Sequence, residues 1–201
     1  MPLQTFNLRT YVKRFFRCRC LTNIATGDHK QTGSVLCAVP YMIEILSSSV
    51  AGASTALRRD SVELLEQICW AIGNIAGDCD EYRNILISNG CLPAVLAFLE
   101  SSVADNARGR SPVRNTGAPV DERPSSAAQT AAWALSNLSR GKVPGQLFLE
   151  TGKVSYLLDL MNGQVKGLSE EVWWLFTFLT AKDDNTVNAL LELGILQVNF
   201  N

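Results

Sequence analysis

Apolar residues recur along this chain at the three- and four-residue spacing that is typical of amphipathic helices. No run alternates apolar and polar residues with the period of two that a half-buried strand needs, so the sequence predicts an all-α fold. Four of the predicted helices end on similar sequence. These endings are CLTNIATG, AIGNIAGD, ALSNLSRG and LFTFLT, at residues 20–27, 71–78, 134–141 and 175–180. A helical segment that recurs in this way indicates a repeat protein.

The repeat period is uneven, and two insertions explain why. The fourth residue of each similar segment, the marker position, is Asn23, Asn74, Asn137 and Phe178 in turn. Successive markers are 51, 63 and 41 residues apart, whereas helical HEAT and armadillo repeats are about 40 to 47 residues long. Residues 47–60 are mostly small and polar, and residues 101–126 contain no Leu, Ile or aromatic residue. Segments of this composition cannot cover a core, and without about ten and about twenty of their residues the period becomes nearly constant.

The predicted organisation is therefore one solenoid domain of about three and a half repeats. Each repeat is expected to hold a short helix, a corner, a second helix and a longer third helix that ends near the marker. The chain begins in a third helix and ends where a second helix would start, which predicts a fragment, an isoform or a truncated gene product. The predicted units are a partial repeat 8–27, repeats 28–78, 79–141 and 142–181, with 101–126 disordered, and a partial repeat 182–201.

The second full repeat shows the expected corner chemistry. Gly90 suits the left-handed residue that ends a helix, and Pro93 suits the first turn of the helix that follows. Gly152 and Gly194 predict the same corner in later repeats, whereas residues 37–40 lack the glycine. The helices expected in this repeat are residues 80–88, 94–100 and 125–139.

Pairs of tryptophan and asparagine lie one helical turn apart near the ends of two third helices. Trp70 precedes Asn74 by four residues, and Trp133 precedes Asn137 by four, so each pair projects from one helix face. Neighbouring indoles can hold the aliphatic stem of a Lys or Arg side chain and attract its charge. An Asn amide both donates and accepts, so it can hold the backbone of an extended peptide. The carboxylate of Asp78 adds negative potential beside these pairs.

Three segments carry a family resemblance: LTNIA with Gly27 and Thr32, EQICWAIGNIAGD at 66–78, and WALSNLSRGK at 133–142. With nearly all of the chain outside the insertions, they resemble the armadillo repeats of importin-α, the adaptor that carries nuclear-localisation signals. The resemblance implies a right-handed armadillo superhelix, an adaptor that is not an enzyme, residence in cytoplasm and nucleus, and cargo proteins with Lys- or Arg-rich signals as partners. It also implies that Gly27, Thr32 and Asp78 form the pocket for the key lysine of the signal. The remaining peptide-binding residues that it implies are Asn23, Gln67, Trp70, Asn74, Trp133, Asn137, Arg140 and Trp174.

The chain departs from the family pattern at three places. Arg19 stands where the family has tryptophan, so one indole is lost and a positive charge enters the expected groove. Phe178 replaces the polar marker in the last unit. The first twenty residues are basic but too short and too apolar to match the importin-β-binding arm, so docking to importin-β is not expected.

Charge and hydropathy narrow the class of partner. Residues 1–27 hold five basic residues and no acidic one, so the remainder, with 13 basic and 19 acidic residues, is net −6. An acidic body argues against nucleic acid and suits a cationic partner. The longest uncharged stretches are 16 residues, at 84–99 and 124–139, and both are shorter than the roughly 20 apolar residues of a membrane-spanning helix.

No residue pattern indicates catalysis, a cofactor or a metal ion. The six cysteines lack paired metal-ligand spacing and are expected to be free or buried thiols. His29, the single histidine, has no carboxylate placed near it by any motif, so a solvated side chain is expected. The hypothesis that the chain is an enzyme has no support, because the sequence shows no nucleophile elbow and no phosphate loop. A signal adaptor and a divergent armadillo scaffold for another extended segment both stay open, because fold alone does not separate them.

Overall fold

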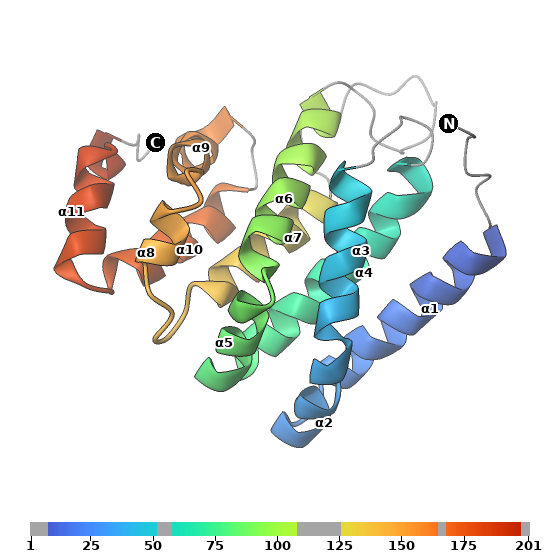
Figure 1. The fold of residues 1–201 in the computed structure, drawn as a ribbon. Coiled ribbons are helices and arrows are strands. Elements are labelled where there is room, and N and C mark those ends of the chain that lie inside the picture. Colours follow the sequence, from blue (N-terminus) through green and yellow to red (C-terminus); the bar gives the residue numbers. More distant parts are fainter. Residues whose placement is uncertain (1–7, 52–57, 108–125, 165–167, 198–201) are drawn as a thin grey trace.

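Helices follow one another along the described chain (Figure 1). The computed structural model describes residues 8–51, 58–107, 126–164 and 168–197, and within these ranges there is no strand, as the helical periodicity predicts. The α-helices are α1 Leu8–Ala25, α2 His29–Ser34, α3 Val39–Ala51, α4 Arg58–Asp78, α5 Asp80–Ser88, α6 Cys91–Ala107, α7 Ser126–Leu138, α8 Gln146–Leu149, α9 Val154–Asp159, α10 Ser169–Thr180 and α11 Asp184–Glu192. Short 3₁₀ turns cover Leu36–Ala38 and Ile195–Gln197, and a π turn, Leu160–Gln164, extends α9.

Two rows of helices pack side by side. Helices α1, α4, α7 and α10 contact one another in that order and form what we call the third-helix row. Helices α3 and α6 contact each other in a second row, and α6 also packs on α7 (Figure 1). Each helix of the third-helix row therefore has the previous and the next one as neighbours, which is the arrangement of a solenoid.

The core runs along the third-helix row. Ile68, Ile72 and Ile75 of α4 and Leu135 of α7 are fully buried, and each side chain of this size contributes about 1.5–3 kcal/mol when it leaves water. Alanines on α7 let the helix approach its neighbours closely, and α4 and α7 make the most extensive contact between any two described helices. These alanines are Ala127, Ala128, Ala131, Ala132 and Ala134.

The glycine corners form as the sequence predicts. Gly90, Gly152 and Gly194 have φ values of +81°, +65° and +90°, in the left-handed region that side chains disfavour. The first full repeat, which lacks the glycine, turns instead through the 3₁₀ segment Leu36–Ala38. Its preceding residue, Val35, keeps a right-handed φ of −92°. The chain thus has two ways to make the same corner.

The predicted insertions are shorter than the composition indicated. Helix α6 begins at Cys91 and continues to Ala107, so residues 101–107 are helical, and placing them in a disordered insertion was wrong. Ser102 is only 8% exposed there, and no Gly or Pro interrupts the helix before residue 109. Likewise α3 extends to Ala51 and α4 begins at Arg58. Residues 52–57 and 108–125 of the two insertions lie outside the described residues.

None of the described helices is by itself long and apolar enough to cross a membrane. Helices α5 and α6 reach the required length only when taken together, and they meet at a bend of 76°.

Candidate functional site

Three successive helices of the third-helix row each carry a tryptophan four residues before the marker position. Trp70 on α4 and Trp174 on α10 are exposed, with 44% and 51% of their surface accessible. Trp133 on α7 lies between them in the row and is half-buried. Arg19 holds the equivalent position on α1 and is exposed. The predicted indoles therefore share one row, but they are not equally accessible.

The residue just before the marker explains this difference. On α4 it is Gly73, where a Cβ atom would overlap the Trp133 ring, so the indole of α7 lies directly against the backbone of α4. On α1 and α7 the same position holds Thr22 and Ser136, both buried. Thr22 donates to the Gln67 carbonyl at 3.0 Å, and Ser136 Oγ lies 3.5 Å from a carboxylate oxygen of Glu171. At this position Thr22 and Ser136 thus place a hydroxyl against the next helix, whereas Gly73 leaves room for the Trp133 indole.

The two marker asparagines also differ. Asn137 is buried at 8% exposure, and its Nδ2 donates to the Gly73 carbonyl at 3.1 Å. Asn74 is half-buried, and its Nδ2 is covered without a hydrogen-bond partner among the described residues. Asn23 is exposed on α1. Asn137 therefore joins α7 to α4, whereas the amide of Asn74 is left unsatisfied.

A resident cation lies at the α10 end of the row. The Arg140 guanidinium lies over the Phe178 ring, 5.7 Å from its centroid. The Trp174 ring stacks on the same Phe178 ring, with ring centroids 5.9 Å apart. Arg140 Nη1 is also 3.5 Å from Asn137 Oδ1. Two of the predicted peptide-binding residues, Arg140 and Trp174, are thus linked through the phenylalanine that replaces the polar marker.

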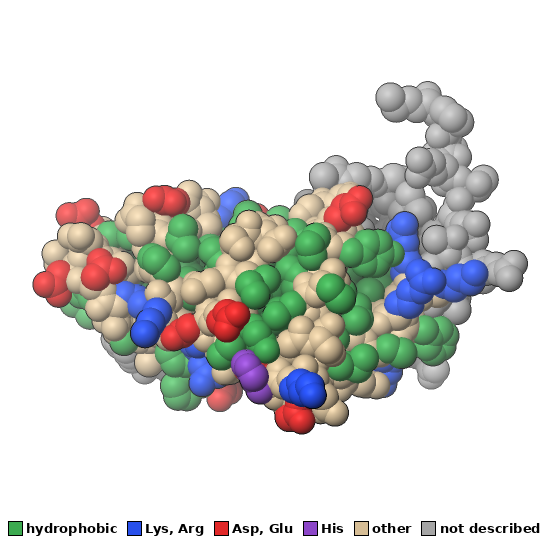
Figure 2. Space-filling view, turned by 60° about the horizontal axis from the view of Figure 1, so that its bottom comes forward, with side chains coloured by type: hydrophobic (Ala, Val, Ile, Leu, Met, Phe, Trp, Pro, Cys, Tyr) green, Lys and Arg blue, Asp and Glu red, His purple; other side chains and the backbone are tan. Residues whose placement is uncertain are grey.

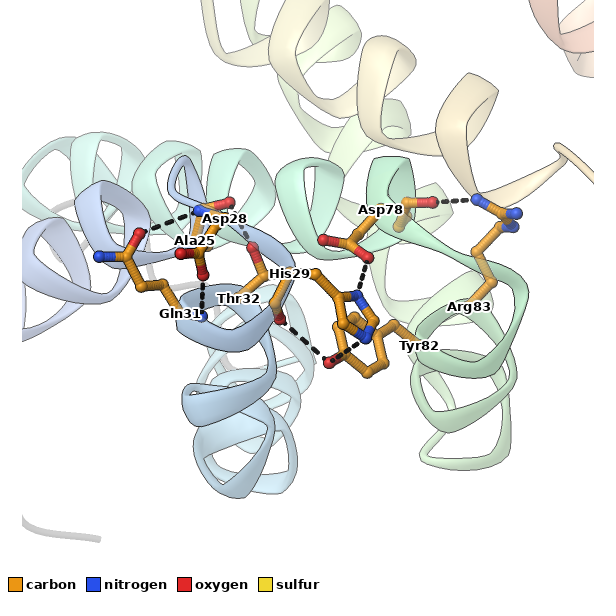
Figure 3. A network of polar contacts seen from close by, with 9 residues as sticks. Ala25, Asp28, His29, Gln31, Thr32, Asp78, Tyr82 and Arg83 are labelled. Carbon is orange, nitrogen blue, oxygen red and sulfur yellow. Dashed lines mark hydrogen bonds and ion pairs between the residues drawn. The ribbon is translucent and has the colours of Figure 1, made fainter.

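The predicted lysine pocket contains a side chain that the sequence did not place there. Figure 3 shows His29 between Asp78 and Tyr82. His29 Nδ1 is 2.6 Å from Asp78 Oδ1, and the Tyr82 hydroxyl is 3.3 Å from Nε2. The His29 and Tyr82 rings stack at 4.8 Å with an interplanar angle of 2°. The His29 side chain is 65% exposed, as expected for a solvated histidine, but it also contacts a carboxylate that no sequence motif placed beside it.

The other two residues predicted for this pocket flank it. Thr32 is 1% exposed, and its hydroxyl donates to the Ala25 carbonyl at 3.3 Å, so it ties α2 to the end of α1. Gly27 is exposed, and a Cβ atom there would overlap the side chain of Gln31. Gln31 completes the capping box that begins α2 at Asp28. Gln67, predicted for the adjoining groove, is 8% exposed and offers its backbone carbonyl to Thr22.

The carboxylates at the junction of α4 and α5 are in different states. Asp80 accepts a hydrogen bond from Arg83 at 2.6 Å and one from the Lys142 N–H at 3.1 Å, and these bonds hold its pKa below the usual value. Burial, reinforced by the negative charge of Asp78, raises the pKa of Tyr82. Asp80 is thus held by partners within the protein, whereas the ion-pair partner of Asp78 among the described residues is the exposed His29.

Charge is distributed unevenly over the surface. Figure 2 shows basic side chains gathered toward the end of the molecule at which α1 lies, and hydrophobic side chains exposed between the charged ones. Basic side chains therefore cluster at the α1 end of this face, and further ones lie among acidic side chains toward the opposite end.

The structure also adds residues that sequence reasoning missed. His29 contacts Asp78 across 49 residues of sequence and Tyr82 across 53, and no local spacing signals such contacts. Gly73 could have been found, because it stands inside a predicted helix at a position where the other units have Thr or Ser. Within the described ranges, one group of ligand atoms is close enough to hold a metal ion, that of His29, Asp78 and Cys79, all within 4.8 Å.

Comparison with known proteins identifies the repeat. The chain matches no family model. It is 33% identical over 182 residues to importin subunit alpha-9 of Arabidopsis thaliana, and 28% identical over 184 residues to a probable importin subunit alpha-A of Dictyostelium discoideum. These alignments cover 89% and 88% of this chain. A designed armadillo-repeat protein in complex with the peptide (KR)4 has a TM-score of 0.67 and 21% identity, over 95% of this chain and 72% of its own. This chain is an armadillo-repeat protein similar in sequence to the importin α subunits.

The armadillo fold explains the third-helix row. A second designed armadillo-repeat protein has a TM-score of 0.66 and 19% identity over 94% of this chain and 71% of its own, so the expected α-solenoid is confirmed. The chain spans about 30% of the length of the importin α relatives named above. The similarity covers the armadillo helices that carry Trp70, Trp133 and Trp174.

Proposed function

We propose that this armadillo row binds an extended, Lys- or Arg-rich peptide, and that the protein is an adaptor-like receptor for nuclear-localisation signals. The observation that carries the proposal is the pair of exposed indoles, Trp70 and Trp174, at equivalent positions of α4 and α10. An indole with about half of its surface accessible can contact the stem of a peptide cation and attract its charge. The net charge of −6 after residue 27 favours the same ligand.

The polar groups of α4 fit the backbone and head group of such a peptide. Asn74 Nδ2 is covered and has no partner among the described residues, and it would donate to a peptide carbonyl if the side chain turned outward. Asp78 lies at the end of the same helix, where a lysine ammonium would replace His29 as its ion-pair partner. Trp133 and Asn137 support the row instead, because they are packed on and bonded to Gly73. The likeness to the designed protein that holds (KR)4 agrees with this choice of ligand.

Residence in cytoplasm and nucleus and cargo proteins with basic signals belong to the same proposal, which extends the similarity to importin α to the chain's activity. The proposal does not include importin-β, because none of the contacts described in the third-helix row points to that partner.

The test is the binding of a fluorescently labelled lysine-rich peptide, measured by anisotropy. We expect binding by the natural chain, weakened by about fivefold or more in a Trp70→Ala, Trp174→Ala variant, because each cation–indole contact contributes about 0.5–2 kcal/mol. These two positions are chosen because Trp133 also packs on Gly73. Affinity should fall as salt is raised.

Tyr41→Ala is the matched control, since Tyr41 is 40% exposed on α3, outside the third-helix row. It should leave peptide affinity unchanged. No binding by the natural chain, or equal binding by the double variant, would sink the proposal.

One set of contacts favours the second function, a scaffold for a different extended segment. Arg140 lies on Phe178 where the next peptide cation would be expected, and Arg19 stands exposed in place of the first tryptophan. These two cations suit acidic side chains at both ends of the row. An acidic labelled peptide in the same assay decides between them: tighter binding of the acidic peptide than of the lysine-rich one would establish the scaffold.

A further inference from the structure

The cluster of His29, Asp78 and Cys79 brings together three different kinds of ligand atom at the surface where α2 meets the junction of α4 and α5. An imidazole nitrogen, a carboxylate oxygen and a thiol sulfur all lie within 4.8 Å of one another. We propose that this cluster is a binding site for a zinc-class divalent cation. The site goes beyond peptide binding and does not depend on it.

Hydrogen bonding around His29 orients the ring for a cation. The Tyr82 hydroxyl has one proton, and it donates that proton to the His29 carbonyl oxygen at 3.1 Å. The hydroxyl oxygen therefore accepts from Nε2, 3.3 Å away. This leaves Nδ1 to face the Asp78 carboxylate at 2.6 Å. At this distance a proton bridges the two atoms, and a divalent cation that displaces this proton would bind both of them once they move apart to the roughly 3 Å that separates two ligand atoms of zinc.

The surroundings hold this arrangement in place. Tyr82 is 7% exposed and stacks flat on the His29 ring, and its hydroxyl fits over Gly33, where a Cβ atom would overlap it. A hydrogen-bonded partner on the second ring nitrogen is the usual support of a metal-binding histidine. Figure 3 shows the ring fixed between the two helices by these contacts.

Cys79 completes the donor set from the other side. It is the residue before α5, its backbone is extended at φ −150° and ψ 168°, and its side chain caps no helix N–H. The thiol is half-buried and forms no disulfide. Because it directly follows Asp78, the two ligands come from one rigid corner.

The donor chemistry selects the metal. Zinc accepts nitrogen, oxygen and sulfur ligands together, whereas magnesium and calcium prefer oxygen alone. Three protein ligands leave the fourth tetrahedral position to water. Sequence spacing did not signal the site, because His29 lies 49 residues from its nearest partner.

The test is titration of the full chain with Co²⁺, which substitutes for zinc and absorbs strongly when a thiolate binds it. We expect one cobalt per chain, a thiolate charge-transfer band, and loss of that band when Zn²⁺ is added. Cys79→Ser should abolish the band. Tyr82→Phe should keep all three ligands and weaken binding by about 10–100-fold through loss of the supporting hydrogen bond. Circular dichroism checks that each variant is folded.

Cys37→Ser is the matched control, because Cys37 is an exposed thiol outside the cluster. The band should survive in this variant. A band that persists in Cys79→Ser, or its absence from the natural chain, would overturn the site, and loss of the band in Cys37→Ser would reveal adventitious thiol binding only.

A bound zinc would also occupy Asp78, and this consequence rests on the proposed function. Zn²⁺ should then lower the affinity for the lysine-rich peptide in the natural chain but not in Cys79→Ser. The cobalt band requires no peptide, so a failed peptide assay leaves the metal site testable on its own.

Discussion

Helices α4 and α7 carry the same Trp-x-x-x-Asn motif, but the two motifs do different work. On α4 the indole is 44% exposed and the asparagine Nδ2 has no partner among the described residues. On α7 the indole rests on Gly73 and the asparagine bonds to the Gly73 carbonyl. The cause lies on the preceding helix, which offers Thr22 to α4 and Gly73 to α7. The same motif therefore leaves its indole exposed on one helix and packs it as an internal joint on the next, depending on a single neighbouring residue.

We expect the largest change in stability when a side chain is added at Gly73, in the space that the Trp133 ring occupies. Gly73→Ala places a Cβ atom where the Trp133 ring lies. We expect a loss of about 1–3 kcal/mol of unfolding free energy from overpacking, measured by urea denaturation. Gly77→Ala is the matched control one turn along α4, where a Cβ atom would be 3.7 Å from Asn137 Nδ2, an ordinary contact. It should be neutral or stabilising by up to about 1 kcal/mol. Equal destabilisation by both substitutions would contradict this account of α7.

A smaller effect should separate the two asparagines. Asn137→Ala removes the donor to the Gly73 carbonyl, and we expect a cost of about 1–2 kcal/mol in unfolding free energy. Asn74→Ala removes an amide whose Nδ2 already lacks a partner within the described ranges, so stability should change by less than about 0.5 kcal/mol. Chemical denaturation of both variants checks the pair. A larger cost at Asn74 than at Asn137 would reverse the comparison.

We expect the smallest effect from Asp80, the first residue of α5, which joins the end of α4 to the segment that follows α7. The Lys142 N–H, just after α7, bonds to Asp80, whose pKa is lowered in the folded protein chiefly by Arg83. The unfolded chain then binds this proton more readily than the folded one, starting from a value near 3.8. The stabilisation is complete above that value and is lost as pH falls through the lowered folded pKa. Stability curves of the natural chain and Asp80→Asn, measured from pH 6 to pH 3, should therefore converge at the acid end; parallel curves would refute the role of this carboxylate.

Local patterns predicted most of the fold. Helical periodicity and the glycines at 90, 152 and 194 placed the helices and corners because these signals act within a few residues. Composition misjudged residues 101–107, which are polar yet continue α6, because a helix continues until Gly or Pro stops it. The row of tryptophans was also predictable from spacing. Which of them is exposed was not, since Trp133 depends on Gly73, 60 residues earlier in the chain.

The candidate site shows the same limit. The sequence placed Asp78 at a helix end, and α4 ends at this residue. It could not show that His29 already contacts this carboxylate, or that Tyr82 holds the imidazole from its other nitrogen. Contacts between residues some 50 positions apart arise only when neighbouring repeats stack.

Because Trp133 on α7 is packed on Gly73, the two exposed indoles are separated by a full helix, and this separation determines how long a ligand must be to touch both. Trp70 and Trp174 are the exposed pair, and α7 stands between their helices. Packed helices are about 8–10 Å apart, so a chain that touches both indoles must cross about 20 Å. At about 3.3 Å per extended residue, this distance corresponds to roughly six residues. Peptides shorter than this can engage one indole at a time, so affinity should rise in a step, not smoothly, as a basic ligand is lengthened.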